Sequence, residues 1–203
     1  MSLSTTDGFS LEHRWSIPHT PNRVAVLCHP HPLHGGSMNA PLLRRIKNVL
    51  VDRGFAVLRF NFRGVGESEG TFGGGVSEVL DVDAAIDLAR STYPDLPLGI
   101  AGWSFGSVTA LRWSAQHRAE MPYAGIGTPI GSDLSLELPE LRHLAPAPRT
   151  FIIGDNDQFT TVAKVQEYAA TIGAQVAVVP GSDHFFFVKE GVVGELVADA
   201  LSR

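Results

Sequence analysis

Apolar positions along the chain follow two alternating patterns. Short, nearly continuous apolar runs are typical of strands buried on both faces, whereas apolar residues spaced three and four apart are typical of one helix face. The strand pattern occurs at residues 24–28, 55–62, 98–101, 123–127, 150–153 and 175–179. The helical pattern occurs at residues 41–53, 78–93, 105–117, 162–172 and 193–201. The alternation of strand and helix along the chain predicts an α/β fold, with a mostly parallel central sheet and helices on both faces.

The remaining segments predict little further regular structure. Residues 9–17 are candidates for antiparallel strands at the edge of the sheet. Residues 128–149 contain four prolines, which leave room for one short helix around residues 135–144 but not for a cap domain. Because no linker or internal repeat divides the sequence, we expect a single domain over residues 1–203.

Composition and charge limit the classes of function. Of the 203 residues, 44% are hydrophobic and 18% are charged, a balance that favours a folded core over disorder. A net charge of −5 without basic runs argues against binding to nucleic acid. No signal peptide and no apolar run of membrane-spanning length is visible, so we expect a cytoplasmic protein that does not bind a membrane. The single cysteine, Cys28, excludes an intrachain disulfide and is expected to be a buried apolar residue.

The sharpest chemical motif is Gly102-Trp103-Ser104-Phe105-Gly106. It follows a predicted strand and precedes a predicted helix, which is the context of a nucleophile elbow. Such a turn is tight, and glycines two residues on either side of the serine keep side chains out of the crossing backbones. The start of the helix also directs backbone N–H groups toward developing negative charge. The motif therefore predicts Ser104 as a nucleophile.

A serine nucleophile needs a general base, and in this kind of site the expected chain order is serine, acid, histidine. Three histidines follow Ser104 in the sequence. His117 lies in the helix after the turn and His143 lies in a charged stretch, so both are expected to be solvated. His184 follows the strand predicted at residues 175–179, where loops gather at one edge of a parallel sheet. His184 is the predicted base.

The acid that orients this base has two candidates. Asp155 and Asp157 both follow the strand predicted at residues 150–153, and position alone does not choose between them. Asp183 is adjacent to His184 in the sequence and is therefore poorly placed to bond to its ring. We expect Asp183 to shape the turn instead.

Together these motifs resemble the α/β-hydrolase fold family, and in particular its small lidless members similar to dienelactone hydrolases. The resemblance covers essentially the whole chain. It is carried by His29-Pro30-His31-Pro32 with Gly35-Gly36, by Asn61-Phe62-Arg63-Gly64-Val65-Gly66-Glu67-Ser68, by the turn at Ser104, by Gly154-Asp155-Asn156-Asp157 and by Asp183-His184. The resemblance implies that Asp157, rather than Asp155, is the acid. The chain departs from the family in having serine where true dienelactone hydrolases have cysteine, and His29-Pro30 where His-Gly is common.

The second departure affects the oxyanion hole. One donor is expected to be the N–H of Phe105, the residue after the nucleophile, and the other should come from the loop after the strand at residues 24–28. Pro30 and Pro32 have no N–H group, so the second donor is His31 or Leu33. The sequence does not choose between these two.

Two motifs have alternative interpretations. His29, His31 and His34 are three potential metal ligands, but two prolines stiffen their loop and no carboxylate accompanies them, so we expect no metal site. The glycines of residues 64–70 suggest a dinucleotide loop, but their spacing is G-x-G-x-x-x-G and no helix follows directly. We expect neither a metal nor an organic cofactor.

These residues predict a serine hydrolase that acts on small carboxylic ester-type substrates through an acyl-enzyme intermediate. Thioesters and amides react by the same chemistry, so a thioesterase or a peptidase remains an alternative. A protein of this fold that only binds ligands is a second alternative, because fold alone does not imply activity. The presence of all three triad candidates, in the expected order and at strand ends, argues against the second alternative.

Overall fold

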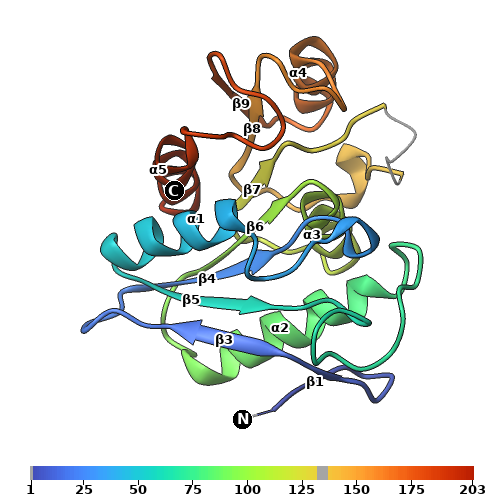
Figure 1. Ribbon diagram of the computed structural model, residues 1–203, viewed down its shortest axis with the longest axis vertical. Coiled ribbons are helices and arrows are strands. Elements are labelled where there is room, and N and C mark those ends of the chain that lie inside the picture. Colours follow the sequence, from blue (N-terminus) through green and yellow to red (C-terminus); the bar gives the residue numbers. More distant parts are fainter. Residues whose placement is uncertain (1, 132–136) are drawn as a thin grey trace.

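Seven strands form one sheet in a computed structural model that describes residues 2–131 and 137–203 (Figure 1). Their order across the sheet is β3-β5-β4-β6-β7-β8-β9. The strands are β3 (His13–Ser16), β4 (Arg23–Cys28), β5 (Phe55–Phe60), β6 (Leu98–Trp103), β7 (Tyr123–Ile126), β8 (Arg149–Gly154) and β9 (Gln175–Val179). All neighbours are parallel except β3, which pairs antiparallel with β5 at one edge. The predicted mostly parallel sheet is confirmed.

Helices cover both faces of this sheet, as the sequence predicts (Figure 1). They are α1 (Pro41–Asp52), α2 (Glu78–Thr92), α3 (Phe105–Gln116), α4 (Val162–Thr171) and α5 (Glu190–Leu201). The apolar sides of α1 and α5 pack on one face, and those of α2, α3 and α4 pack on the other. In β4, Val24 and Val26 face the second group of helices, while Ala25 and Leu27 face the first. Burial on both faces explains why the strand patterns are continuous instead of alternating.

The start of the chain forms two separate pieces of antiparallel structure. Within residues 9–17, β3 joins the large sheet, whereas β2 (Ser10–Leu11) pairs with β1 (Leu3–Ser4) in a ladder of its own. The expected edge strand is therefore present as β3.

Two strands end two residues away from their predicted ends, and the others end within one residue of them. β5 ends at Phe60, because the N–H of Phe62 leaves the ladder and donates to Nε2 of His29. β6 continues to Trp103, because Gly102 and Trp103 still pair with Gly125 and Ile126 of β7. Both differences come from pairing partners that are remote in sequence.

The connection from β7 to β8 is short. In its described part the only regular element is a 3₁₀ helix, η2 (Leu141–His143). The helix expected around residues 135–144 is thus shorter than expected where it is described, and residues 135–136 lie outside the described residues. Tyr168 of α4 donates its hydroxyl proton to the Pro139 carbonyl, which holds this connection against the sheet-covering helices. Within residues 2–131 and 137–203, no helix has the length and apolar character needed to cross a bilayer.

Candidate active site

Ser104 occupies the turn that joins β6 to α3. Its φ and ψ of 54° and −120° lie in a region that side chains rarely adopt, and such strain is common at functional sites. The flanking glycines are required, because a Cβ on Gly102 would lie 2.3 Å from the carbonyl carbon of Gly106. A Cβ on Gly106 would lie 2.5 Å from the carbonyl oxygens of Cys28 and His29. The two glycines thus let β6, α3 and the end of β4 approach closely enough to form the turn.

The first turn of α3 directs free backbone donors toward Ser104. Phe105 is the first residue of the helix, and within the described residues its N–H has no acceptor. The N–H groups of a first helical turn carry partial positive charge, which favours an anion at this point. An oxyanion that forms on a group bound at Ser104 would meet this donor.

His184 and Asp157 form a buried pair. Nδ1 of His184 lies 2.8 Å from Oδ2 of Asp157, and the two side chains are 5% and 0% exposed. The other carboxylate oxygen, Oδ1, accepts the N–H groups of Phe159 at 2.9 Å and Thr160 at 3.3 Å. Three hydrogen bonds therefore fix the orientation of the carboxylate, and the carboxylate in turn holds the imidazole through Nδ1.

The alternative acid has a different environment. Asp155 is exposed, and its Oδ1 accepts the N–H of Ser182 at 3.2 Å. Of the two aspartates that the sequence leaves open, the structure joins Asp157 to His184. Asp183 shapes the turn, as expected, since its Oδ1 accepts the N–H groups of Phe185 and Phe186.

Several contacts bring His184 to the serine turn. The Trp103 indole N–H, one residue before Ser104, donates to the His184 carbonyl at 3.2 Å. The N–H of Ser104 donates to the Ile126 carbonyl at 2.8 Å. The next residue, Gly127, lies under the imidazole, where an added Cβ would be 3.0 Å from Nδ1 and Cε1 of His184. The loops that follow β6, β8 and β9 thus bring Ser104, Asp157 and His184 to one edge of the sheet.

Three residues of this site were not singled out in the sequence. Trp103 and Gly127 contact His184 as described above, and Gln158 accepts the N–H of His184 through its side-chain oxygen at 3.2 Å. Gly127 had a detectable signal, because a glycine at the end of a buried strand often marks a close approach of other atoms. Trp103 and Gln158 had none, because their partner is more than twenty residues away in the chain.

The loop after β4 carries the other expected donors. It contains a short 3₁₀ helix, η1 (Pro32–His34), whose Leu33 N–H donates to Nδ1 of His31 at 3.2 Å. The N–H of His31 has no acceptor among the residues that the structure describes. The His31 ring packs on Phe105 and Phe72 at centroid distances of 5.2 and 5.0 Å. Burial and the neighbouring His34 lower the pKa of His31 below its ordinary value.

His29 anchors the start of this loop from inside the protein. Its side chain is buried, Nδ1 donates to the Pro30 carbonyl at 2.6 Å, and Nε2 accepts the Phe62 N–H at 2.9 Å. Burial lowers the pKa of His29 to about 4. Because both ring nitrogens are occupied, His29 has none left for a metal. No group of three or more potential ligands suited to a metal ion occurs within residues 2–131 and 137–203.

The other residues considered from the sequence lie elsewhere. His117 and His143 are exposed, and His117 lies 3.2 Å from Asp83. Cys28 is buried, and desolvation raises the pKa of its thiol. In the glycine-rich loop of residues 64–70, the N–H of Glu67 donates to a carboxylate oxygen of Glu12, so a group of this chain occupies that donor.

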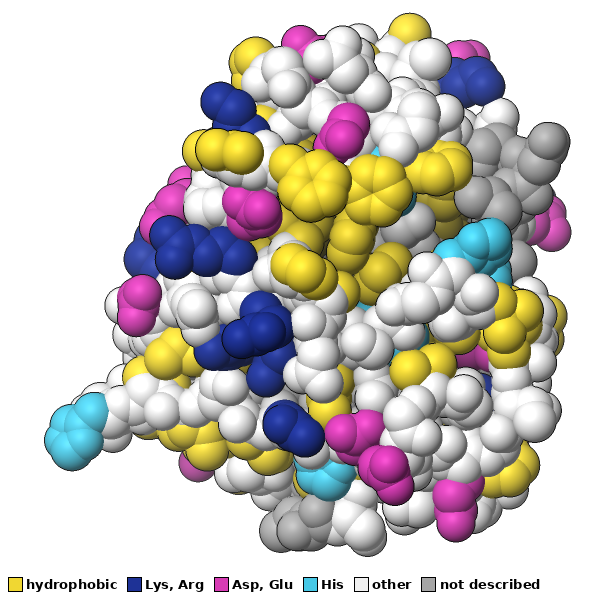
Figure 2. All heavy atoms as spheres, viewed as in Figure 1, with side chains coloured by type: hydrophobic (Ala, Val, Ile, Leu, Met, Phe, Trp, Pro, Cys, Tyr) yellow, Lys and Arg dark blue, Asp and Glu magenta, His cyan; other side chains and the backbone are white. Residues whose placement is uncertain are grey.

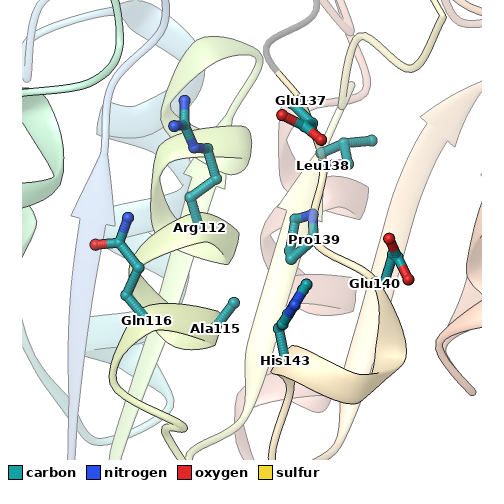
Figure 3. A pocket seen from close by; sticks show the side chains of 8 residues that line it. All are labelled: Arg112, Ala115, Gln116, Glu137, Leu138, Pro139, Glu140 and His143. Carbon is teal, nitrogen blue, oxygen red and sulfur yellow. The ribbon is translucent and has the colours of Figure 1, made fainter.

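A hollow of about 320 Å³ lies away from the serine turn, between α3 and the chain around η2 (Figure 3). Arg112, Ala115 and Gln116 of α3 line one wall, and Glu137, Leu138 and His143 line the other. Its walls mix both charges with apolar atoms, and none of Ser104, Asp157 or His184 lines it.

Comparison with known proteins places this arrangement in a family. The sequence model of the family described as serine aminopeptidase S33 matches residues 24–127. The chain is 32% identical to an uncharacterised protein of Rickettsia prowazekii over 204 residues, which cover 94% of this chain and 84% of the relative.

Two solved structures have nearly the same fold. An α/β serine hydrolase homologue from Coxiella burnetii superposes with a TM-score of 0.86 at 26% identity, over 99% of this chain and 96% of that one. A serine hydrolase without a lid from Xanthomonas campestris superposes with a TM-score of 0.85 at 28% identity, over 100% and 93% of the two chains. The chain therefore belongs to the serine aminopeptidase S33 family of α/β hydrolases.

Proposed function

We propose that this hydrolase is a serine esterase of small carboxylic esters, with Ser104 as nucleophile, His184 as base and Asp157 as the orienting acid. The observation that carries the proposal is a strained serine turn joined to a buried histidine–aspartate pair by the hydrogen bond from the Trp103 indole to the His184 carbonyl. A serine hydroxyl is a weak nucleophile until a base removes its proton. The histidine–aspartate pair supplies such a base, already held in one tautomer.

The reaction has two halves. His184 Nε2 takes the proton from Ser104 Oγ as this oxygen bonds to the ester carbonyl carbon. When the tetrahedral intermediate collapses, the carbon–oxygen bond to the alcohol breaks, and His184 returns the proton to the leaving oxygen. In the second half, His184 takes a proton from a water molecule as the water oxygen bonds to the acyl carbon. The bond from this carbon to Ser104 Oγ then breaks, His184 returns the proton to Oγ, and the carboxylic acid is released. Throughout, the Asp157 carboxylate stabilises the imidazolium and stays ionised.

The oxyanion is stabilised by the N–H groups of Phe105 and His31. The sequence left His31 and Leu33 open, and the hydrogen bonds favour His31, because the Leu33 N–H already donates to the His31 ring. Most substitutions leave the backbone N–H of residue 31 in place, but His31→Pro would remove it.

The scheme uses no metal or organic cofactor, so hydrolysis is expected to be the same with and without EDTA.

The first test is covalent labelling. The purified protein is treated with a fluorophosphonate, and the adduct is mapped by mass spectrometry. We expect one label per chain on Ser104, no label on Ser104→Ala, and slow labelling of His184→Ala, in which the base is missing. A wild-type protein that stays unlabelled would contradict the assignment and favour a ligand-binding protein. A label at another residue would contradict Ser104 as the nucleophile.

The second test separates ester, thioester and amide substrates. Initial rates are compared for p-nitrophenyl acetate, an acyl-coenzyme A thioester and an aminoacyl p-nitroanilide. The proposal expects the ester to give the largest kcat/KM, and expects Ser104→Ala to abolish its turnover while the fold stays intact by circular dichroism. A labelled Ser104 together with a larger kcat/KM for the thioester or the anilide would keep the mechanism and overturn the substrate class.

A further inference from the structure

The loop between β9 and α5 exposes large apolar side chains next to His184. Phe185 is 40% exposed, Phe187 is 68% exposed and Val188 is 91% exposed. The rings of Phe185 and Phe187 lie 5.9 Å apart with planes inclined by 31°, and we call these two residues the aromatic shelf. Figure 2 shows hydrophobic side chains gathered on the face that contains this loop in Figure 1. Exposed apolar surface of this extent often marks a binding site.

The backbone of the loop is strained in a way that keeps the shelf exposed. Phe186 and Val188 have φ of 55° and 64°, which non-glycine residues, and β-branched ones above all, rarely adopt. The side chain of Phe186 is fully buried, and its carbonyl accepts the N–H of Lys189 at 2.9 Å. Phe186 therefore anchors the loop while its two neighbours point away from the core. Strain of this kind is retained where the conformation has a use.

The shelf is continuous with the base of the proposed triad. The Phe185 ring lies 5.7 Å from the His184 ring and 6.2 Å from the Trp103 ring. A second aromatic residue, Phe72, lies instead against the side chains of the two residues that carry the proposed oxyanion donors. Its ring is 5.0 Å from that of His31 and 5.7 Å from that of Phe105. Aromatic side chains thus divide into a group beside the base and a group beside the oxyanion donors.

This division has a chemical consequence that rests on the proposed function. His184 returns its proton to the leaving oxygen, so that oxygen must lie within hydrogen-bond distance of Nε2. The carbonyl oxygen points to the N–H groups of Phe105 and His31. A substituent on the leaving oxygen therefore extends from the His184 side, where the shelf lies. We propose that Phe185 and Phe187 bind the alcohol part of the substrate, and that the substrates are small acyl esters of aryl or arylalkyl alcohols.

The test varies the two sides of the ester separately. Ethyl acetate is compared with 2-phenylethyl acetate, which adds a ring to the alcohol at nearly constant leaving-group basicity, and with ethyl 3-phenylpropanoate, which adds a ring to the acyl part. The alcohol ratio is kcat/KM for 2-phenylethyl acetate divided by kcat/KM for ethyl acetate. The acyl ratio is kcat/KM for ethyl 3-phenylpropanoate divided by kcat/KM for ethyl acetate. In Phe187→Ala we expect the alcohol ratio to fall about three- to tenfold, as for loss of one aromatic contact, and the acyl ratio to change by less than about twofold.

Two variants serve as controls. Ile17→Ala removes another exposed apolar side chain, 53% exposed and directly after β3, and should change neither ratio. Phe72→Ala removes the aromatic residue on the oxyanion side, and should leave the alcohol ratio within about twofold of the wild type. Because Phe187 is mostly exposed, its alanine variant should unfold at the wild-type temperature, which calorimetry checks.

The outcomes separate this inference from the proposed function. An unchanged alcohol ratio in Phe187→Ala, or an equal fall in both ratios, would overturn the role of the shelf while leaving the esterase in place. A wild-type protein that hydrolyses none of the three esters and takes no fluorophosphonate label would instead overturn the proposed function itself.

Discussion

Asp157 and Asp155 are two residues apart and chemically identical, but they have different hydrogen-bond partners. Asp157 is buried and bonded to the His184 ring, whereas Asp155 is exposed and bonded to a loop N–H. We expect Asp157→Asn to lower kcat by a factor on the order of 10⁴, because the amide no longer accepts the Nδ1 proton and favours the wrong tautomer. Asp155→Asn should change kcat by no more than about threefold, because Asp155 does not bond to the ring that transfers the proton.

Steady-state kinetics on p-nitrophenyl acetate measures both aspartate variants, and their melting temperatures show whether the fold is kept. Equal losses in the two variants, or a greater loss at position 155, would show that His184 takes its orientation from another group.

His29 supplies a prediction on pH dependence at the same scale. Its pKa in the folded protein is about 4, because burial disfavours the imidazolium, whereas in the unfolded chain it is about 6.5. Between these values the unfolded state binds a proton that the folded state does not. The free energy of unfolding should therefore decrease as pH falls from about 6.5 to about 4, by up to about 3 kcal/mol from this residue.

The measurement is urea denaturation of the wild type and His29→Gln at several pH values. A glutamine oxygen is able to accept the Phe62 N–H but does not titrate. The difference in unfolding free energy between the two proteins should shrink toward low pH, and parallel curves would mean that His29 has the same pKa in the folded and unfolded states.

At the scale of elements, the junction of β6, α3 and β4 depends on the absence of a side chain at position 106. Gly106→Ala would force its Cβ to within 2.5 Å of two carbonyl oxygens, so the helix and strand must separate. We expect a loss of about 3 kcal/mol in unfolding free energy, at the upper end for an overpacked site, together with loss of activity.

Gly191→Ala is the matched control for this junction. Position 191 lies in α5, and the nearest atom to an added Cβ there is 3.6 Å away, an ordinary contact. Alanine should stabilise the helix by up to about 1 kcal/mol. Thermal denaturation compares the two variants, and similar melting temperatures would show that the close approach at the turn is easily relieved.

At the scale of the whole molecule, the short connection between β7 and β8 leaves the proposed site with little cover. Between β7 and β8, where a lid would be inserted, the part of the chain described holds only η2 as a regular element. Phe72 and Phe159 are half-buried, and Phe185 is exposed, at the rim beside the serine turn. A site of this kind buries little of a long acyl chain, and each CH₂ contributes only about 0.8 kcal/mol where it is buried.

We therefore expect p-nitrophenyl acetate or butyrate to give a larger kcat/KM than p-nitrophenyl palmitate. We also expect no increase in rate at the concentration at which substrate or detergent forms micelles. Rates that climb toward palmitate, or rise sharply at that concentration, would show that a long acyl chain is bound in a covered channel.

Local patterns in the sequence determined the elements and their kind. Burial on two faces makes a strand apolar throughout, and burial on one face makes a helix apolar every three to four residues, so residues 24–28 and 41–53 were recognisable without any partner. The same holds for the serine turn, because its glycines are needed by backbone crossings only a few residues away.

Only the tertiary structure decided which groups meet. The bond from His184 to Asp157 joins residues 27 apart, and its choice over Asp155 depends on the path of two loops that no periodicity describes. The Leu33 N–H donates to the His31 ring only because the loop after β4 folds into a short 3₁₀ helix. The place of Gly127 beneath the imidazole depends on the pairing of β7 with β6 and β8. Sequence patterns record how each residue is buried, but hydrogen bonds between distant segments form only when the whole chain has folded.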